Sequence, residues 1–385
     1  MRVKLKDIFD LQMGKTPSRS NLEYWNTTDY KWISIADLSK TSKYIFETKE
    51  YLSKSAIKDS GIKAIPASTV VMSFKLSIGK TAITKEDMYS NEAIMAFKDK
   101  HVINILPEYI FYLFKYKNWE EGSNKAVMGK TLNKATLSEI EVEICSIEKQ
   151  RQIVSILNKI MSVVDGRKQE LQLLDALIKA RFVELFGDAI HNDKGWENDT
   201  VEKLCKEIYG GGTPSKSHPE YYEDGDIPWV SSKDMKTDVL TDSQIKINQL
   251  GVDNSTARMV PINSVIMVIR SGILKHTLPV AINAVPITVN QDLKVFIPNE
   301  RVLTRFLAIQ FKMHEKDILS GVRAVTADNI EFNSLKQREL IVPPIELQQE
   351  YVIFLEQIDK SKVAVQKALD ETQILFDSLM QKYFG

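Results

Sequence analysis

The sequence predicts an α+β fold made of two related halves, each a globular region followed by one long helix. Three observations predict it. Motifs recur about 197 residues apart, short apolar runs alternate with turn residues in the first part of each copy, and a heptad pattern of apolar residues ends each copy.

The repeat consists of motifs in the same order. Residues 14–18 (Gly-Lys-Thr-Pro-Ser) are matched by residues 211–215 (Gly-Gly-Thr-Pro-Ser), and an aromatic pair follows each motif. The set Trp32, Ser34 and Asp37 recurs with a shift of 197. Later matches are Asn91-Glu92 with Asn290-Gln291, residues 148–150 with 346–348, and Phe186-Gly187 with Phe384-Gly385. Two related surfaces in tandem favour a ligand with two parts.

Length and composition bound the class of protein. The 385 residues, 43% of them hydrophobic, suffice for two domains with their own cores. Cys145 and Cys205 stand at unrelated positions, so the sequence encodes neither a disulfide framework nor a zinc site. We find no apolar signal segment, and the longest uncharged apolar stretch, near residues 259–269, is too short to span a bilayer. A soluble, cytoplasmic protein is expected.

The net charge is zero, but its distribution is uneven. Residues 1–187 carry 29 Lys and Arg against 23 Asp and Glu, whereas residues 188–385 carry 22 against 28. A nucleic-acid-binding protein usually has a basic surplus, so the balance argues mildly against such a ligand. A local patch of cations would still suffice for phosphate binding.

The globular part of each copy mixes predicted strands with shorter predicted helices. The strands are expected at residues 32–35, 69–72, 94–97, 228–230, 264–269 and 293–296, and the helices at residues 108–117 and 301–313.

A continuous helix of about 38 residues is predicted at the end of each copy. Apolar residues are spaced alternately four and three apart, in the same phase in both copies, which is typical of a coiled-coil seam. The seam residues are Ile153, Leu157, Ile160, Val164, Leu171, Leu174, Ile178 and Leu185 in the first helix, and Tyr351, Leu355, Ile358, Val365, Leu369, Phe376, Leu379 and Tyr383 in the second. The obvious partner for each apolar stripe is the other helix. A break at Asp165-Gly166 is the alternative.

Four positions of this heptad pattern are polar, namely Arg167, Arg181, Lys362 and Thr372. Two interpretations stay open. The long side chains could extend to the surface, or they could fix the register of two unlike helices.

No catalytic constellation is recognisable. Gly-Lys-Thr occurs three times, but each time the glycine of a phosphate-binding loop is missing five residues earlier. His314-Glu315 lacks the second histidine of a zinc protease, and Ile318 stands in its place. We therefore expect a binding protein with no catalytic, metal or cofactor residues of its own.

These motifs, in this order and in two copies, resemble the specificity subunit of Type I restriction-modification systems. The junction Ile345-Glu346-Leu347-Gln348, preceded by Val342-Pro343-Pro344, is similar to the family's proline-rich lead into its long helix. The first junction departs from it, with Ile144-Cys145-Ser146-Ile147 in place of the prolines. The resemblance covers essentially the whole chain.

The resemblance implies a division of labour. Residues 1–147 and 188–345 would be target recognition domains, each reading one half of a bipartite sequence in double-stranded DNA. Residues 148–187 and 346–385 would form an antiparallel coiled-coil spacer. Two methyltransferase subunits would dock on the helices, bind S-adenosylmethionine and methylate adenine, and an ATP-dependent restriction subunit could join them.

Base edges and phosphates are usually contacted by cationic and polar side chains on exposed loops. Such residues beside glycines and strand ends are Lys15, Arg19, Lys75, Lys80, Lys130 and Lys134 in the first copy, and Lys216, Lys233, Arg270, Lys275, His276 and Arg323 in the second. For any single cation, a solvated surface residue is the favoured interpretation, and DNA contacts are expected to be enriched only in the set as a whole. The repeated Thr-Pro-Ser fits an ordinary turn, and Trp32 and Trp229 fit the core better than a base-stacking platform.

Two other classes of function stay open. A duplicated non-enzymatic scaffold that binds proteins or carbohydrate would explain the neutral charge. An enzyme with an unrecognised active site would turn over a substrate without a partner.

Overall fold

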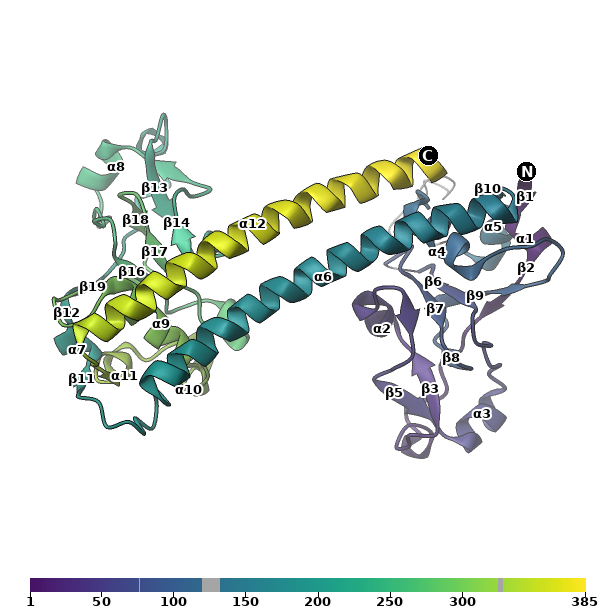
Figure 1. Cartoon of the computed structure of the whole chain (residues 1–385), viewed down its shortest axis with the longest axis horizontal. Helices are drawn as coiled ribbons and strands as arrows, with labels where there is room; N and C mark the ends of the chain where they lie inside the picture. The colour runs from purple at the N-terminus through teal and green to yellow at the C-terminus, as the bar shows by residue number, and fades with distance from the viewer. Residues whose placement is uncertain (76, 120–131, 325–327) are drawn as a thin grey trace. The chain divides into compact units, whose positions relative to one another are not determined.

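The computed structural model describes all residues except 76, 120–131 and 325–327. Two helices of forty residues, α6 (Ile147–Phe186) and α12 (Ile345–Phe384), are its longest elements (Figure 1). The chain forms two compact units. Unit 1 comprises residues 1–168 and 367–385, and unit 2 comprises residues 169–366, so each unit contains a segment of both long helices.

Unit 1 is built around a five-stranded sheet with the order β2-β9-β6-β7-β4. All neighbours in it are antiparallel except β4 and β7, which are parallel. A second sheet has the order β5-β3-β8, and β1 pairs with β10. The strands are β1 (Arg2–Lys4), β2 (Phe9–Met13), β3 (Tyr30–Ile33), β4 (Tyr44–Ile45), β5 (Glu50–Leu52), β6 (Val70–Ser73), β7 (Thr81–Thr84), β8 (Tyr89–Ser90), β9 (Ile94–Asp99) and β10 (Glu141–Glu143). The helices are α1 (Leu5–Ile8), η1 (Leu22–Tyr24), α2 (Ile35–Lys40), α3 (Lys54–Ser60), α4 (Pro107–Tyr116) and α5 (Lys134–Glu139).

Unit 2 repeats this plan. Its five-stranded sheet has the order β12-β19-β16-β17-β14, its three-stranded sheet the order β15-β13-β18, and β11 pairs with β22. The strands are β11 (Asn198–Thr200), β12 (Cys205–Gly210), β13 (Ile227–Val230), β14 (Val239–Leu240), β15 (Lys246–Ile247), β16 (Val265–Val268), β17 (Val280–Asn283), β18 (Thr288–Val289), β19 (Leu293–Pro298), β20 (Arg323–Ala324), β21 (Asp328–Asn329) and β22 (Glu339–Ile341). The helices are α7 (Val201–Leu204), η2 (Pro219–Tyr221), α8 (Gln249–Asp253), η3 (Gly272–Lys275), α9 (Thr304–Met313), α10 (Glu315–Ser320) and α11 (Phe332–Lys336). The predicted α+β repeat is confirmed.

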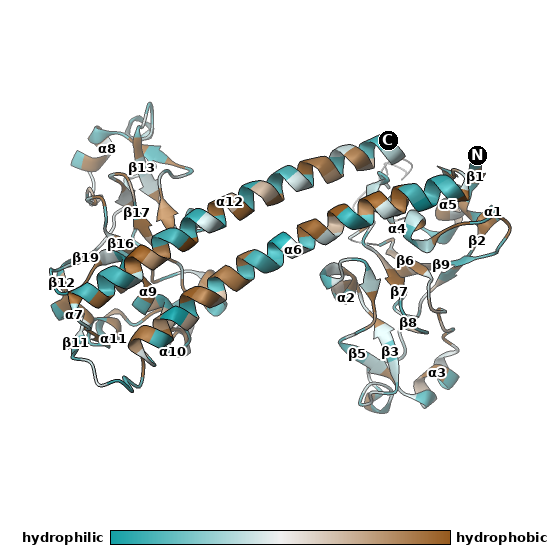
Figure 2. Cartoon of the chain, viewed as in Figure 1, coloured by the Kyte–Doolittle hydropathy of each residue, from teal (hydrophilic) through white to brown (hydrophobic). Residues whose placement is uncertain are grey.

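The core of unit 1 forms where α4 and the long helices cover its sheets. The rings of Phe9, Phe97 and Phe114 meet edge to face, which favours a tight aromatic core. Leu157 from α6 and Phe376 from α12 belong to the same buried cluster. In Figure 2 the sheet strands β6 and β7 are hydrophobic, whereas the long helices alternate between hydrophobic and hydrophilic residues.

The core of unit 2 takes its aromatic residues from the opposite ends of the same helices. Phe182 and Phe186 of α6 pack against Tyr351 of α12 and against Phe306 of α9. The Tyr351 hydroxyl donates to the Ile178 carbonyl at 2.9 Å. The end of α6 therefore lies against the start of α12 in unit 2, and the start of α6 lies with the end of α12 in unit 1. This is antiparallel pairing in each unit.

All the predicted seam residues are buried or half-buried. Two of the polar positions make ion pairs between the long helices inside unit 2. Arg181 donates to Glu350 at 2.7 Å, and Lys362 pairs with Asp175. These contacts favour the interpretation that the polar positions help to fix the register.

A buried glutamine anchors the start of each long helix. Gln150 accepts a hydrogen bond from the Leu106 amide at 2.9 Å and donates to the carbonyls of Asn104 and Cys145. Gln348 makes the equivalent set, with the Leu303 amide and the carbonyls of Arg301 and Pro343. The repeated Glu-Xaa-Gln motif therefore has a structural explanation.

Two details differ from the expectations. The strand predicted at residues 32–35 ends at Ile33, because Ser34 caps α2 with its side chain and Ile35 begins that helix. The alternative of a helix break at Gly166 is wrong, because α6 runs through it without interruption.

None of the helices in the described part of the chain has the length and apolar character that a membrane span requires.

Replacing Gln348 with leucine should destabilise unit 2. Leucine has a similar volume but leaves one buried N–H and two carbonyls unpaired, which we expect to lower the free energy of unfolding by about 3 kcal/mol. Denaturant unfolding followed by circular dichroism checks this. Gln349→Leu, at the exposed neighbouring position, is the control and should change stability by less than about 0.5 kcal/mol. Equal losses in both variants would contradict the anchoring role.

Candidate nucleic-acid interface

In each unit, several loops converge on one turn. In unit 1 this is residues 91–93, which we call the first hub turn. The Asn91 amide donates to Ile33 of β3, and the Phe74 amide, at the start of the β6–β7 loop, donates to Ala93. The Lys15 amide donates to Ser90 at 2.8 Å, which joins the Gly-Lys-Thr-Pro-Ser loop to the same corner.

Unit 2 has the same arrangement around residues 290–292, the second hub turn. The Asn290 amide donates to Val230 of β13, and the Gly212 amide donates to Val289 at 3.0 Å. The Ile269 amide, at the start of the β16–β17 loop, donates to Asp292 at 2.9 Å. The two units therefore present the same set of loops on the same backbone framework.

The repeated glycines permit a close approach of backbone segments. A Cβ atom on Gly14 would lie 2.1 Å from the Asn91 carbonyl oxygen, and one on Gly211 would lie 1.9 Å from that of Val289. Neither contact is possible for a residue with a side chain.

The repeated tryptophans hold the loop in place, and the repeated serine and aspartate close the turn that follows β3 and β13. The indole N–H of Trp32, which is 2% exposed, donates to the Lys15 carbonyl at 3.1 Å. Trp229, at 6% exposure, makes the same bond to Gly212 at 2.9 Å. Both tryptophans are thus core residues that anchor the loop. Asp37 accepts hydrogen bonds from the Ser34 amide and hydroxyl, as Asp234 does from Ser231.

Four predicted DNA-binding cations of unit 1 lie around the first hub turn. Arg19 pairs with Glu50, and its guanidinium lies 3.8 Å from the centre of the Trp25 ring. Lys75 follows Phe74, and Lys80 donates to the Ser39 hydroxyl at 2.5 Å.

The fourth of these cations, Lys15, donates from its ammonium group to the Ser60 carbonyl. These four residues come from loops that share the hub turn. Most of their charged groups already have a protein partner, so nucleic acid would have to compete with these contacts.

In unit 2, the predicted residues gather at the corresponding place. Arg270 forms an ion pair with Asp292 of the second hub turn at 2.6 Å, and Lys275 lies 3.8 Å from Asp328. Lys216, Lys233 and His276 are exposed on the surrounding loops. The backbone of Arg323 lies in β20, which pairs with Asn329, and Asn329 bridges in turn to Arg270.

Two predicted residues are not part of these groups. Lys130 lies outside the described residues. Lys134 begins α5. The hydrogen bond from Lys98 holds the pKa of Asp10, near the start of β2, below its usual range, and the charge of Lys134 is close enough to act in the same direction. The Gly-Lys-Thr-Pro-Ser loop follows the other end of β2, so the structure does not bring Lys134 to the first hub turn.

The exposed side chains of Glu92 and Gln291 stand at the centre of the hub turns, yet sequence reasoning did not single them out. The Thr16 hydroxyl donates to Glu92, and the Thr213 hydroxyl donates to Gln291. The sequence feature that could have identified them is the recurrence of Asn91-Glu92 as Asn290-Gln291. Motif recurrence shows equivalence, but it does not show which side chain is exposed.

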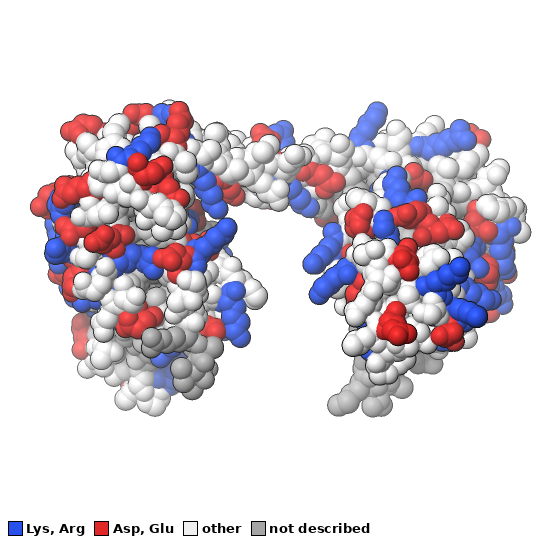
Figure 3. Space-filling model, turned by 90° about the horizontal axis from the view of Figure 1, so that it is seen from below, with Lys and Arg blue, Asp and Glu red and all other residues white. Residues whose placement is uncertain are grey.

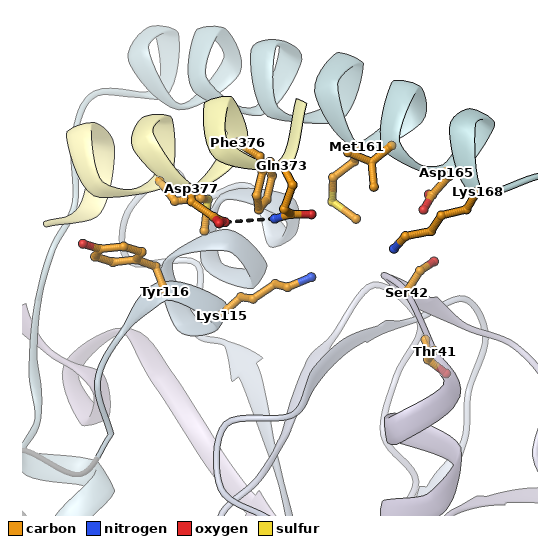
Figure 4. Close-up of a pocket in the computed structure, with 12 residues that line it drawn as sticks. Thr41, Ser42, Lys115, Tyr116, Met161, Asp165, Lys168, Gln373, Phe376 and Asp377 are labelled. Atoms are coloured by element: carbon orange, nitrogen blue, oxygen red, sulfur yellow. Dashed lines mark hydrogen bonds between the residues drawn. The ribbon is translucent and has the colours of Figure 1, made fainter. Parts of the chain in front are cut away.

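A pocket of about 420 Å³ lies in unit 1 between α4, α6 and α12. Lys115 from α4 and Lys168 from α6 both extend into it, opposite Phe376 and Asp377 of α12 (Figure 4). Unit 2 has a pocket of about 600 Å³ in the corresponding place, lined by residues of α6, α9 and α12.

Within the described residues, no group of three or more acidic, histidine or cysteine side chains could hold a metal ion.

Known proteins share both the sequence pattern and this fold. The family model described as Type I restriction modification DNA specificity domain matches residues 1–175 and again residues 193–372. The specificity subunit of the Type I restriction enzyme MjaIX from Methanocaldococcus jannaschii is 25% identical over 403 residues, covering 98% of this chain and 91% of that protein. The EcoR124I/EcoR124II specificity subunit from Escherichia coli is 33% identical over 219 residues, covering 56% of this chain and 52% of its own length.

A solved structure supports the same fold. The crystal structure of a Type I restriction-modification S subunit from M. genitalium aligns over 100% of this chain and 96% of its own, with a TM-score of 0.57 at 12% identity. Because the family model matches nearly the whole chain in two copies, the chain belongs to the specificity subunits of Type I restriction-modification systems, which are non-catalytic subunits that give the enzyme its DNA specificity.

Proposed function

We propose that this chain reads a bipartite target in double-stranded DNA, with residues 1–147 reading one half-site and residues 188–345 the other. One observation carries the proposal: the same hub turn, surrounded by the same basic loops, occurs once in each unit. Residues 148–187 and 346–385 act as spacer helices that set the separation of the half-sites.

The cations around the hub turns contact phosphates and base edges. In this proposal the DNA-contacting residues are Lys15, Arg19, Lys75, Lys80 and Lys130 in the first half, and Lys216, Lys233, Arg270, Lys275, His276 and Arg323 in the second. Lys134 would contact a phosphate away from the hub turn. Basic and acidic side chains are interspersed on the face drawn in Figure 3, so a partner wrapped around the DNA would supply part of the phosphate neutralisation.

The reaction belongs to partner subunits. Two methyltransferase subunits bind S-adenosylmethionine and methylate adenine, and an ATP-dependent restriction subunit could complete the assembly. Equivalent pockets beside the helices in the two units support two equivalent docking sites. A cytoplasmic location is part of the proposal. The two free cysteines support it, because cysteines in the reducing cytoplasm are rarely paired in disulfides.

Lys216→Ala should weaken DNA binding by the assembled methyltransferase and make binding less sensitive to salt. Removing one phosphate contact lowers the slope of log K against log salt concentration by about 1. Fluorescence anisotropy at several salt concentrations measures this slope. Lys206→Ala is the control, because Lys206 lies near the start of β12 whereas Lys216 follows its end, and it should leave the slope unchanged. The proposal for Lys216 fails if both variants keep the wild-type slope.

Adding one heptad to each long helix should lengthen the gap between the half-sites. Insertions after Lys168 and after Gln366 fall where the two units divide, so contacts inside each unit are preserved. Seven helical residues add about 10.5 Å, which corresponds to about 3 base pairs. Sequencing of methylated adenines in cells that express the complex gives the gap, and an insertion in one helix only is the control that should abolish the ordered motif. An unchanged gap in the double insertion would contradict the spacer role.

The partner-docking proposal is tested on exposed apolar residues of α6. Leu173 is 61% exposed and Leu177 45%, so glutamate at both positions should leave the fold intact but reduce copurification of the methyltransferase at least about tenfold. Gln172→Glu adds a charge at an exposed neighbouring position and should copurify like the wild type. Equal recovery of the methyltransferase with both variants would show that α6 does not dock it at these residues.

A further inference from the structure

The two hub turns differ at the central side chain, Glu92 against Gln291, and at the next position, where Ala93 is replaced by Asp292, whose carboxylate pairs with Arg270. Glu92 and Gln291 are equivalent in the repeat, both are exposed, and both accept a hydrogen bond from the threonine of the adjacent Gly-Xaa-Thr-Pro-Ser loop. The backbone around them is held in the same way in both units, through bonds to β3 and β13. The chemical difference between carboxylate and amide is therefore presented on a common framework.

The threonine hydroxyl fixes one terminal oxygen of each side chain. Thr16 donates to one carboxylate oxygen of Glu92, which leaves the other oxygen as a hydrogen-bond acceptor. Thr213 donates to the amide oxygen of Gln291, which leaves the amide nitrogen as a donor beside an oxygen with a second lone pair. The first unit thus presents an acceptor alone, and the second presents a donor and an acceptor side by side.

The surroundings keep Glu92 ionised. The hydrogen bond from Thr16 holds the pKa of the Glu92 carboxyl below its usual range, and the nearby charges of Lys75 and Arg19 act in the same direction. Cations this close to the turn would hold DNA phosphates beside it. An ionised carboxylate among phosphates is unfavourable unless it accepts hydrogen bonds from a base.

We propose that Glu92 and Gln291 are specificity-determining residues that read one base each, with Glu92 selecting cytosine and Gln291 selecting adenine. In the major groove, cytosine presents an amino donor that a carboxylate accepts. Adenine presents a donor and an acceptor side by side, which match the oxygen and nitrogen of an amide. This inference rests on the proposed reading of one half-site by each unit.

The test exchanges the two side chains in the full chain assembled with its methyltransferase partner. Methylated sites are mapped across a genome or a random DNA library. For Glu92→Gln, we expect the preference at one position of one half-site to change from cytosine to adenine by about tenfold or more, with the other half-site unchanged. Gln291→Glu should produce the reverse change in the other half-site. Glutamine at position 92 keeps an oxygen for Thr16, so the loop contact survives the substitution.

Glu23→Gln is the matched control, because it removes the same charge from another exposed side chain of unit 1, in η1. It should leave the motif unchanged. The inference is overturned if Glu92→Gln and Gln291→Glu, with wild-type melting temperatures, methylate the same sequences with the same base preferences. Failure of the proposed function looks different, since the wild-type complex would then show no two-part motif at all.

Discussion

The apolar stripe of a forty-residue helix has to be buried against other residues along its whole length. The arrangement of α6 and α12 follows from this constraint. Outside this stripe, the faces of α6 and α12 are too polar to be buried in a core. Both helices are also too long for a single small domain to cover. Each helix gives one segment to each unit, where aromatic residues such as Phe182, Tyr351 and Phe376 complete the core. The buried Gln150 and Gln348 then fix where each helix leaves its globular region.

In the proposed function, the hub turns separate the structural framework from the residues that would read DNA. Glycine and tryptophan hold the loop through contacts with backbone atoms, which do not depend on the exposed side chains of the turn. The exposed positions are then free to vary without altering the fold. A duplicated domain can in this way acquire two different readings from one architecture.

The sequence predicted the elements whose signal is periodic or repeated. The heptad spacing located both long helices, and the shift of 197 related the two units. It misassigned Ser34, because a β-branched and aromatic run does not reveal that the serine side chain caps a helix. It missed the pairing of β1 with β10, because each strand has three residues and they lie far apart in the chain. Lys134 and Glu92 show the same limit at the site, since only the fold determines which charged residues share a loop cluster.

The first unit contains residues 367–385, so its core draws on the part of this sequence that is translated last. Phe376 and Met380 are buried against residues such as Leu157, more than 200 positions earlier. During synthesis, the N-terminal sheets emerge from the ribosome long before residues 367–385, which cover part of them. The apolar surface that these residues cover is therefore exposed while residues 169–366 are made. The core of the first unit can therefore be completed only after residues 367–385 have been synthesised, which follows the synthesis of residues 169–366.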